Sequence, residues 1–329
     1  MKKILQLVVT LIGISILCWF TVELQLDSHN YKMEAQLKLH QEVLNGIAGD
    51  PWQYRVLSPY LLEPILSWFS AHNSPEAALM VFGTFRLLQN FLILVIAFFL
   101  YLRLTGSQIF SLTGVVLLAW SMSHAFWNSD LQFNTYFDLL FYLIFFILYL
   151  KRASSLCFVA LIAIAALNRE TSGLMGLLLI VLSQFDSNLE QTFRKPYAYT
   201  GVLSLIIFVS IYIALRNTFP VQTLLGSGAH YPWTWSMVEH NLFRKITYIN
   251  LFATLSIIPM IALFGVKTWP RMLKIIAIVL VPLWLVVHFI AAVSAETRMF
   301  LVPQAIVFIP GFLFVLLKSR VSTSDIKMT

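Results

Sequence analysis

Apolar stretches of roughly membrane-spanning length follow one another along almost the whole chain. Ten candidates lie at residues 4–22, 78–102, 108–126, 136–150, 154–168, 172–185, 199–216, 248–266, 275–294 and 299–317. Only 11% of the 329 residues are charged and the mean hydropathy is +0.81, whereas soluble domains carry about 25% charged residues. A helix needs about 20 apolar residues to cross a bilayer, so we predict an all-α, polytopic transmembrane protein of about 10 spans. Residues 1–329 are expected to form a single transmembrane domain.

Lysine and arginine residues gather on one side of this predicted topology. With Met1 inside, the inner segments hold 13 of the 22 basic residues and only three acidic ones. Cytoplasmic loops of membrane proteins are enriched in Lys and Arg. The pattern therefore predicts that both termini are cytoplasmic. It also explains the net charge of +7 without a nucleic-acid partner, since no basic patch carries interleaved aromatic residues.

The longest polar segment, about residues 23–77, is the first predicted outer loop. Apolar side chains recur there at every fourth position, at Tyr31, Ala35, Leu39 and Val43. This spacing predicts an amphipathic helix on the membrane surface, ending near Gly46. A second interfacial helix is predicted from Ser58–Pro59, with a kink at Pro64. A late outer loop is expected at about residues 217–247.

Polar and ionisable residues collect at the outer ends of the predicted spans. They are Asp27, Asp50, Tyr54, Arg55, Asp130, Arg169, Glu170, His230, Glu296 and Arg298. Arg86 lies deeper, about a third of the way into the second span. Ionisable residues at membrane depth are costly and usually face a cavity or a partner. We therefore predict that these residues form a polar site on the outer face.

Simpler structural roles would explain several of these residues taken singly. Asp27 can cap the surface helix, and Asp130 can lie before a helix N-terminus, where the helix dipole favours an acid. His230 can be an ordinary exposed loop histidine, and Arg55 can reach a lipid phosphate without specificity. The sequence leaves these alternatives open beside the functional ones.

Two outer turns carry opposite charges close together, Arg169–Glu170 and Glu296–Arg298. Each set can form a local ion pair that closes its turn, or each charge can face a shared site. The gathering of so many ionisable residues on the same side favours the shared site.

These residue types suit the transfer of a group from a lipid-linked phosphate. A carboxylate near the membrane surface, from Asp27, Asp50 or Asp130, can take a proton from an acceptor hydroxyl. Arginines can bind a phosphate bidentately and neutralise the leaving group. The chain has no nucleotide-binding or zinc motif, so no cofactor is certain. A divalent cation is possible, because the three aspartates offer oxygen ligands.

In topology and in a few residues the chain resembles the GT-C class of integral-membrane glycosyltransferases. Asp27 after the first span matches the acid that these enzymes place there, and Asp130 matches a second acid in the next outer loop. The helix of Tyr31 and Ala35, Gly46, and the segment 50–60 match their first outer loop. Arg298, followed by Pro303, matches a late arginine at the outer end of a span. Because Ser28 follows Asp27, the Asp-Glu pair of the protein mannosyltransferases is missing.

The resemblance implies a function and assigns roles. It implies a sugar donor linked to a polyprenyl phosphate, with Asp27 as base or acceptor-orienting acid. It also implies that Arg298, with Arg55 as a second candidate, holds the lipid phosphate. We therefore expect a glycosyltransferase in a bacterial inner membrane, active on its outer face. The alternatives are a polysaccharide polymerase or ligase with a lipid-diphosphate donor, and a transporter or flippase.

Overall fold

The structure, a computed structural model, describes residues 2–27, 33–125, 131, 133–219 and 235–326. Over these residues it is all-helical, with 86% helix and no strand. The predicted fold class is therefore confirmed at this level. Asp130 and His230, two of the predicted site residues, lie outside the described residues.

Six helical segments are long and apolar enough to cross a membrane, which is compatible with an integral membrane protein. They are α1 (Lys2–Asp27), α4 (Pro75–Thr105), α6 (Phe133–Leu150), α9 (Gln191–Thr218), α13 (Arg271–Ala291) and the segment Thr297–Ser319. The last segment joins η6 (Thr297–Phe300), α14 (Leu301–Pro303), the π-helix η7 (Gln304–Phe308) and the start of α15 (Ile309–Ile326).

The predicted count of about ten spans is not confirmed, because the other apolar runs form shorter helices. They are α5 (Gln108–His124), α7 (Ser155–Ala166), α8 (Gly173–Phe185), α11 (Lys245–Leu255) and α12 (Ile258–Phe264). The pair α11 and α12 is bent by 73°, and the number of candidate spans becomes seven if this pair counts as one. Polar residues at 168–172, including η4 (Glu170–Ser172), separate α7 from α8.

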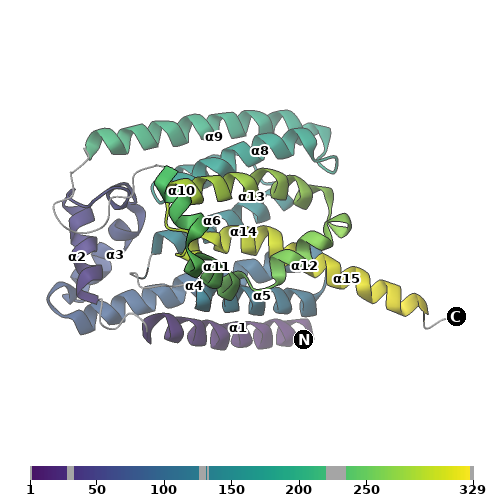
Figure 1. The fold of residues 1–329 in the computed structure, drawn as a ribbon, viewed down its shortest axis with the longest axis horizontal. Helices are drawn as coiled ribbons and strands as arrows, with labels where there is room; N and C mark the ends of the chain where they lie inside the picture. The colour runs from purple at the N-terminus through teal and green to yellow at the C-terminus, as the bar shows by residue number, and fades with distance from the viewer. Residues whose placement is uncertain (1, 28–32, 126–130, 132, 220–234, 327–329) are drawn as a thin grey trace.

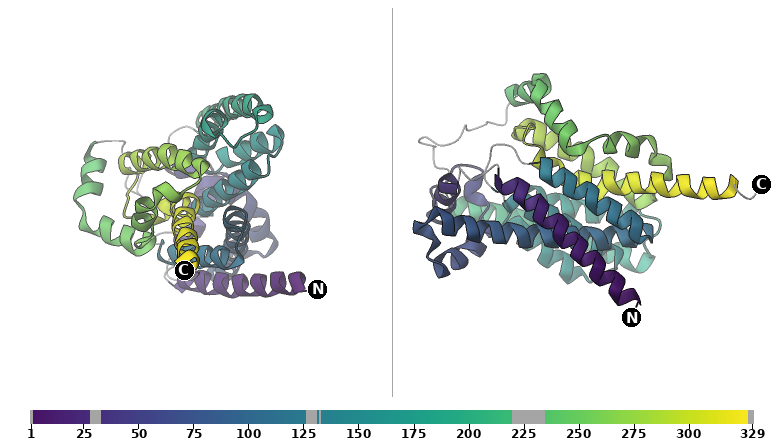
Figure 2. Two further views of the ribbon diagram at one scale, coloured as in Figure 1. Left: turned by 90° about the vertical axis from the view of Figure 1, so that its right-hand side faces the viewer. Right: turned by 90° about the horizontal axis from the view of Figure 1, so that it is seen from below.

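The long helices run roughly along one axis of the molecule (Figure 1). α1 begins and α15 ends towards the same end of that axis. The helices α2 (Met33–Leu44) and α3 (Leu57–Trp68) lie at the opposite end, which we call the platform end. Views along and across this axis show α1 crossing the outside of the bundle (Figure 2). The remaining short elements are η2 (Trp52–Tyr54), η3 (Ala71–Asn73), η5 (Val266–Thr268) and α10 (Trp235–Phe243).

α6 lies in the middle of the bundle, and most of its residues are buried. Its aromatic side chains pack against neighbouring helices, as when Tyr142 meets the Trp284 ring edge-on with centroids 5.5 Å apart. The Tyr142 hydroxyl donates a hydrogen bond to the Thr171 carbonyl, 2.7 Å away. Buried tyrosines need such a partner for their polar end. The central helix is thereby fixed to the turn between α7 and α8.

Helices form at both positions predicted for the first outer loop, but α2 buries a different face from the one expected. Its buried residues are Met33, Gln36, Leu37, His40 and Val43, whereas Ala35 is exposed. The reason is tertiary packing, because α2 docks against α3 and α4 as well as facing outwards. Gly46 follows α2 with a positive φ of 74°, as the sequence predicts for a helix end. Pro64 lies inside α3.

The break between α11 and α12 leaves a helix end inside the bundle. Ser256 there has a φ of 56°. The amide nitrogen Nε2 of Gln304 donates to the carbonyl of Leu255 at 3.2 Å and to Ser121 Oγ at 3.2 Å. The last carbonyls of any helix lack partners within that helix. Gln304, in the π-helical segment η7, supplies the partner for one of these carbonyls.

Candidate functional site

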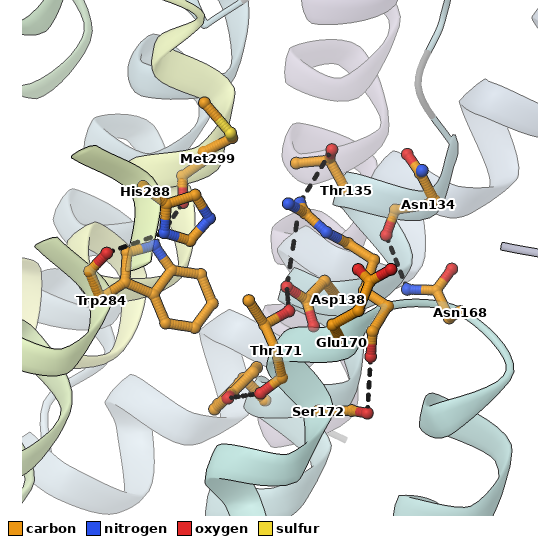
Figure 3. A network of polar contacts seen from close by, with 12 residues as sticks. Asn134, Thr135, Asp138, Asn168, Glu170, Thr171, Ser172, Trp284, His288 and Met299 are labelled. Carbon is orange, nitrogen blue, oxygen red and sulfur yellow. Dashed lines mark hydrogen bonds and ion pairs between the residues drawn. The ribbon is translucent and has the colours of Figure 1, made fainter. Parts of the chain in front are cut away.

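The turn between α7 and α8 is the centre of the candidate site (Figure 3). Asn168 Nδ2 donates to the Asn134 carbonyl at 2.8 Å, and Ser172 Oγ donates to the Arg169 carbonyl at 2.7 Å. The first bond ties the turn to the start of α6, and the second lies within the turn. They hold Arg169 and Glu170 in fixed positions at the platform end.

Arg169 is buried and pairs with a carboxylate of α6. Its Nη1 lies 4.0 Å from Asp138 Oδ2 and donates to Thr135 Oγ1 at 3.2 Å. Thr171 Oγ1 donates to the same Asp138 oxygen at 2.7 Å. The other oxygen, Asp138 Oδ1, is buried and has no hydrogen-bond partner among the described residues. Buried polar atoms usually have a partner, so this oxygen has an unmet capacity to accept a hydrogen bond.

Glu170 turns the other way and pairs with the first outer loop. Its Oε2 lies 3.4 Å from Nη2 of Arg55. Burial raises the pKa of Glu170, but the charges of Arg55 and Arg169 outweigh that effect and hold its pKa below the ordinary value. Burial, followed by the charge of Arg55, lowers the pKa of Arg169 to about 10. Two arginines and a carboxylate from two distant segments of the chain thus act on one another.

A guanidinium group stacked on two aromatic rings borders the Arg55–Glu170 pair. The Arg216 guanidinium near the end of α9 lies 4.1 Å from the Tyr54 ring centroid and 3.7 Å from that of Tyr212. Burial and the nearby charge of Asp50 raise the pKa of Tyr54. The Arg216 charge also reaches Glu170. Cations attract the faces of aromatic rings, so Arg216 is held in place while its charge still acts on the site.

The opposite side of the site comes from α13. Trp284 and His288 lie across from Thr135 and Asp138 (Figure 3). Trp284 Nε1 donates to the Met299 carbonyl at 2.7 Å. His288 Nδ1 lies 2.8 Å from the Trp284 carbonyl, and because a carbonyl only accepts, Nδ1 carries the proton. His288 is buried and lies within electrostatic range of Arg169 and Arg55.

The turn that begins η6 adds another buried arginine, Arg298. Arg298 Nη2 donates to Oε2 of Glu296, two residues before it. Arg298 is 4% exposed, whereas the Glu296 side chain is 35% exposed. The charge of Arg298 reaches Arg169. Arg298 therefore forms a local ion pair with Glu296 and also lies at the edge of the shared site.

Arg86 lies apart from the Arg55–Glu170 pair. Its guanidinium stacks 3.8 Å from the Tyr136 ring centroid and 4.9 Å from that of Phe133. It also donates to Gln89 Oε1 at 2.9 Å. Arg86 and Arg298 both act electrostatically on Tyr136. This tyrosine is the structural link between Arg86 and the site.

The predicted site residues thus divide into three groups. Tyr54, Arg55, Arg169 and Glu170 are brought together, with Asp50, Glu296 and Arg298 at their edge. Arg86 contacts α6 instead. Asp27 is the last residue of α1, while the side chains of Asp27, Asp130 and His230 are not described.

The sequence-based site omits residues that the fold adds to it: Asp138, Arg216, Thr135, Thr171 and His288. The signal for the first two was an ionisable side chain just inside an apolar run. The others carry no signal that distinguishes them from ordinary residues of an apolar helix.

The described residues contain no group of three or more His, Cys, Asp or Glu side chains placed to hold a metal ion. A cation held by Asp27, Asp50 and Asp130 stays a prediction, because two of these side chains are not described.

Comparison with known proteins gives no family: no family model, curated protein or solved structure matches the chain. The chemistry of the site must therefore be inferred from its own geometry.

Proposed function

We propose that this protein is a membrane glycosyltransferase that moves a sugar from a polyprenyl-phosphate donor to an acceptor at the platform end. The observation that supports this most is the convergence of Arg55, Arg169 and Arg298 from three distant segments of the chain. With Arg216 they bring four guanidinium groups into one site, beside the carboxylates of Asp50, Asp138, Glu170 and Glu296. Guanidinium groups gathered in this way supply the hydrogen-bond donors that a phosphate needs.

The arginines would bind the phosphate of the donor. Guanidinium groups match phosphate oxygens bidentately. As the bond between the sugar carbon and the phosphate oxygen breaks, the leaving phosphate keeps the electron pair, and the arginines stabilise its growing negative charge. Binding of the phosphate would compete with Glu170 for Arg55, because the pair is partly exposed.

A carboxylate would accept the proton of the attacking hydroxyl. Asp138 joins Asp27, Asp50 and Asp130 as a candidate, because its Oδ1 is buried without a partner among the described residues. Asp138 also lies beside Arg169, in the same site as the proposed phosphate-binding groups. In this proposal the acceptor oxygen then forms the new bond to the sugar carbon.

The location of the protein is part of the same proposal. We place about ten apolar segments in or along a bacterial inner membrane, with both termini in the cytoplasm. The excess of Lys and Arg in the segments on the side of the termini supports this orientation. The platform end, with its exposed Trp68 and Phe69, would then lie at the outer interface, where aromatic residues are enriched.

Mass spectrometry of lipid-linked sugars and surface glycans tests the function. Cells lacking the protein should accumulate a polyprenyl-phosphate sugar and lose one sugar from a surface glycan. Wild type should reverse both changes. Arg55→Ala tests the binding of the phosphate, whereas Asp27→Asn and Asp138→Asn test which carboxylate accepts the proton. Arg103→Ala is the matched control, because Arg103 is exposed and donates to the carbonyl of Leu150, at the end of α6 opposite Asp138. Unchanged pools in the deletion strain would refute the transferase.

One observation favours a transporter or flippase as the second candidate. The 73° break between α11 and α12 is the kind of discontinuous helix that transporters use at substrate sites. A transporter predicts that the lipid-linked sugar accumulates on the inner leaflet, whereas the transferase predicts accumulation on the outer leaflet. Digestion of intact spheroplasts with a hydrolase that cannot cross the membrane separates the two.

A further inference from the structure

A small cavity lies between α2, η2, α3 and the start of α6, next to the Arg55–Glu170 pair. It has a volume of about 50 Å³ and is lined by Leu39, His40, Trp52, Arg55, Leu62 and Asn134, among other residues. A single water needs about 10–15 Å³ by this measure, and a cavity that binds benzene is about 150 Å³. The cavity therefore admits a substituent of a few atoms and excludes a whole sugar ring.

Two polar atoms of the lining residues lack partners within the described part of the chain. Arg55 Nε is a buried donor and Asn134 Oδ1 is a buried acceptor. The Asn134 side chain belongs to a residue that is only 6% exposed. Leaving a buried donor and a buried acceptor unpaired is costly. A ligand that offers one carbonyl and one N–H would satisfy both atoms.

Apart from Gln36, His40 and Ser58, the remaining residues that line the cavity are apolar. Leu39, Val43, Leu62 and Phe133 line it together with the Trp52 ring, over which Arg55 is stacked at 5.0 Å. A hydroxyl group can donate and accept, but it would leave this apolar wall in contact with water. A methyl group beside an amide would contact these apolar residues, and its removal from water would favour binding. The combination of donor, acceptor and apolar wall matches an acetamido group.

Arg55 also connects this cavity to the proposed phosphate site. Arg55 lines the cavity and has a buried Nε without a partner among the described residues, while its Nη2 contacts Glu170 at 3.4 Å. In a 2-acetamido sugar phosphate, the acetamido group and the phosphate are on neighbouring ring carbons. One arginine can therefore contact both groups of the same donor.

We propose that the cavity binds the acetamido group of a 2-acetamido sugar, so that the donor is a polyprenyl-phosphate N-acetylhexosamine. This inference rests on the proposed function for the identity of the donor. The cavity itself selects the acetamido group, with Arg55 Nε donating to its carbonyl and Asn134 Oδ1 accepting from its N–H. Trp52 and the aliphatic residues enclose the methyl group.

Saturation-transfer NMR with free methyl glycosides tests the binding without requiring any transfer reaction. The full-length protein in nanodiscs is mixed with methyl N-acetylglucosaminide or methyl glucoside, and with the corresponding galacto pair. We expect at least about a tenfold preference for the acetamido sugar of one pair, because the hydroxyl analogue leaves buried groups unpaired. Equal signals from both sugars of each pair, or no signal from any of them, would overturn the proposal.

Variants at position 134 make the test specific. Asn134→Ala removes the acceptor and should abolish the preference, whereas Asn134→Asp keeps an acceptor oxygen and should retain it. The Asn134 carbonyl that receives Asn168 is main chain and is present in both variants. Trp68→Ala is the control, because Trp68 is 84% exposed on α3 and does not line the cavity. A preference that survives Asn134→Ala would contradict the assignment.

The ratio between two sugars in one sample does not depend on the fraction of folded protein. It also separates this inference from the proposed function. A transferase with no acetamido preference would show changed lipid-linked pools and equal NMR signals, so only the cavity assignment would fail.

Discussion

The Arg169–Glu170 turn and the Glu296–Arg298 turn look alike in the sequence but pair differently. In the first, the neighbouring opposite charges form their ion pairs with other residues: Arg169 pairs with Asp138, and Glu170 pairs with Arg55, 115 residues away. In the second, Glu296 and Arg298 pair with each other. The first turn therefore links three segments of the bundle, and the second mainly stabilises itself.

The difference follows from what surrounds each turn. Arg169 is packed against α6, where Asp138 and Thr135 lie one helical turn apart and both reach its guanidinium. Glu296 remains about one-third exposed, so water screens its pair with Arg298. Adjacent opposite charges in a sequence therefore do not indicate which residues will pair. Partners on other elements decide it, since the Arg169 and Arg298 side chains are similarly buried at 5% and 4% and the Glu170 and Glu296 side chains are similarly exposed at 33% and 35%.

Removal of Asp138 should cause the largest loss of stability among the variants of the two turns. Asp138→Ala leaves Arg169 buried without its carboxylate, which typically costs about 3–5 kcal/mol. Unfolding by SDS titration in mixed micelles measures this loss. The double variant Asp138→Ala/Arg169→Ala should recover much of it. A cost no greater than that of Glu296→Ala would show that the two turns are equivalent.

Removal of Arg55 should have the next largest effect, on transfer rather than on folding. Arg55→Ala takes away one donor to the proposed phosphate, and the loss of one such group lowers kcat by about 10²–10³-fold. In vitro transfer from a synthetic polyprenyl-phosphate N-acetylhexosamine measures it. Arg103→Ala should retain wild-type activity. If Arg55→Ala retained it as well, the phosphate role would pass to Arg169 or Arg298.

Acid should weaken the first turn through Glu170. Its pKa is held below the ordinary value of 4.5 by Arg55 and Arg169, so the folded state binds a proton less readily than the unfolded chain. This contribution to stability is present above about pH 4.5 and is lost as the pH falls through the lower folded pKa. Thermal unfolding between pH 6 and pH 3 tests this, and Glu170→Gln should show a smaller decrease. Parallel profiles for the variant and wild type would assign the acid sensitivity to other groups.

Neutralisation of Glu296 should have the smallest effect. Glu296→Gln removes a partly exposed charge from a local pair, and such pairs contribute about 0.2–1 kcal/mol. The change is measured in the same SDS titration, with high salt as the control, since salt already screens an exposed pair. A loss of several kcal/mol would mean that Glu296 is essential to the buried Arg298.

The sequence was sufficient for the parts of the fold that depend on local pattern. The apolar runs predicted helices, and Gly46 and Pro64 were correctly placed at the end of α2 and inside α3. The prediction placed Ala35 and Leu39 on the buried face of α2, whereas the structure buries Gln36 and His40, one position further along the chain. The contacts of α2 with α3 and α4 decide which face is buried.

The site was only partly predictable from the sequence. Arg55, Arg169 and Glu170 were recognised because charges at the ends of apolar segments are uncommon. Their partner Asp138 and the stacked Arg216 were missed, since nothing along the chain relates α6 or α9 to the first outer loop. Such pairings exist only after the helices have packed.

The bond from Gln304 to Leu255 has a consequence for biogenesis. In lipid, a carbonyl at the end of α11 finds no water, and its partner belongs to the last apolar segment of the chain. During synthesis, α11 and α12 therefore leave the ribosome before the group that completes them. The bend of 73° between α11 and α12 is completed when the segment that carries Gln304 packs against them. Truncation before Gln304 should therefore leave the Leu255 carbonyl unpaired, and α11 and α12 bound to the membrane-insertion machinery.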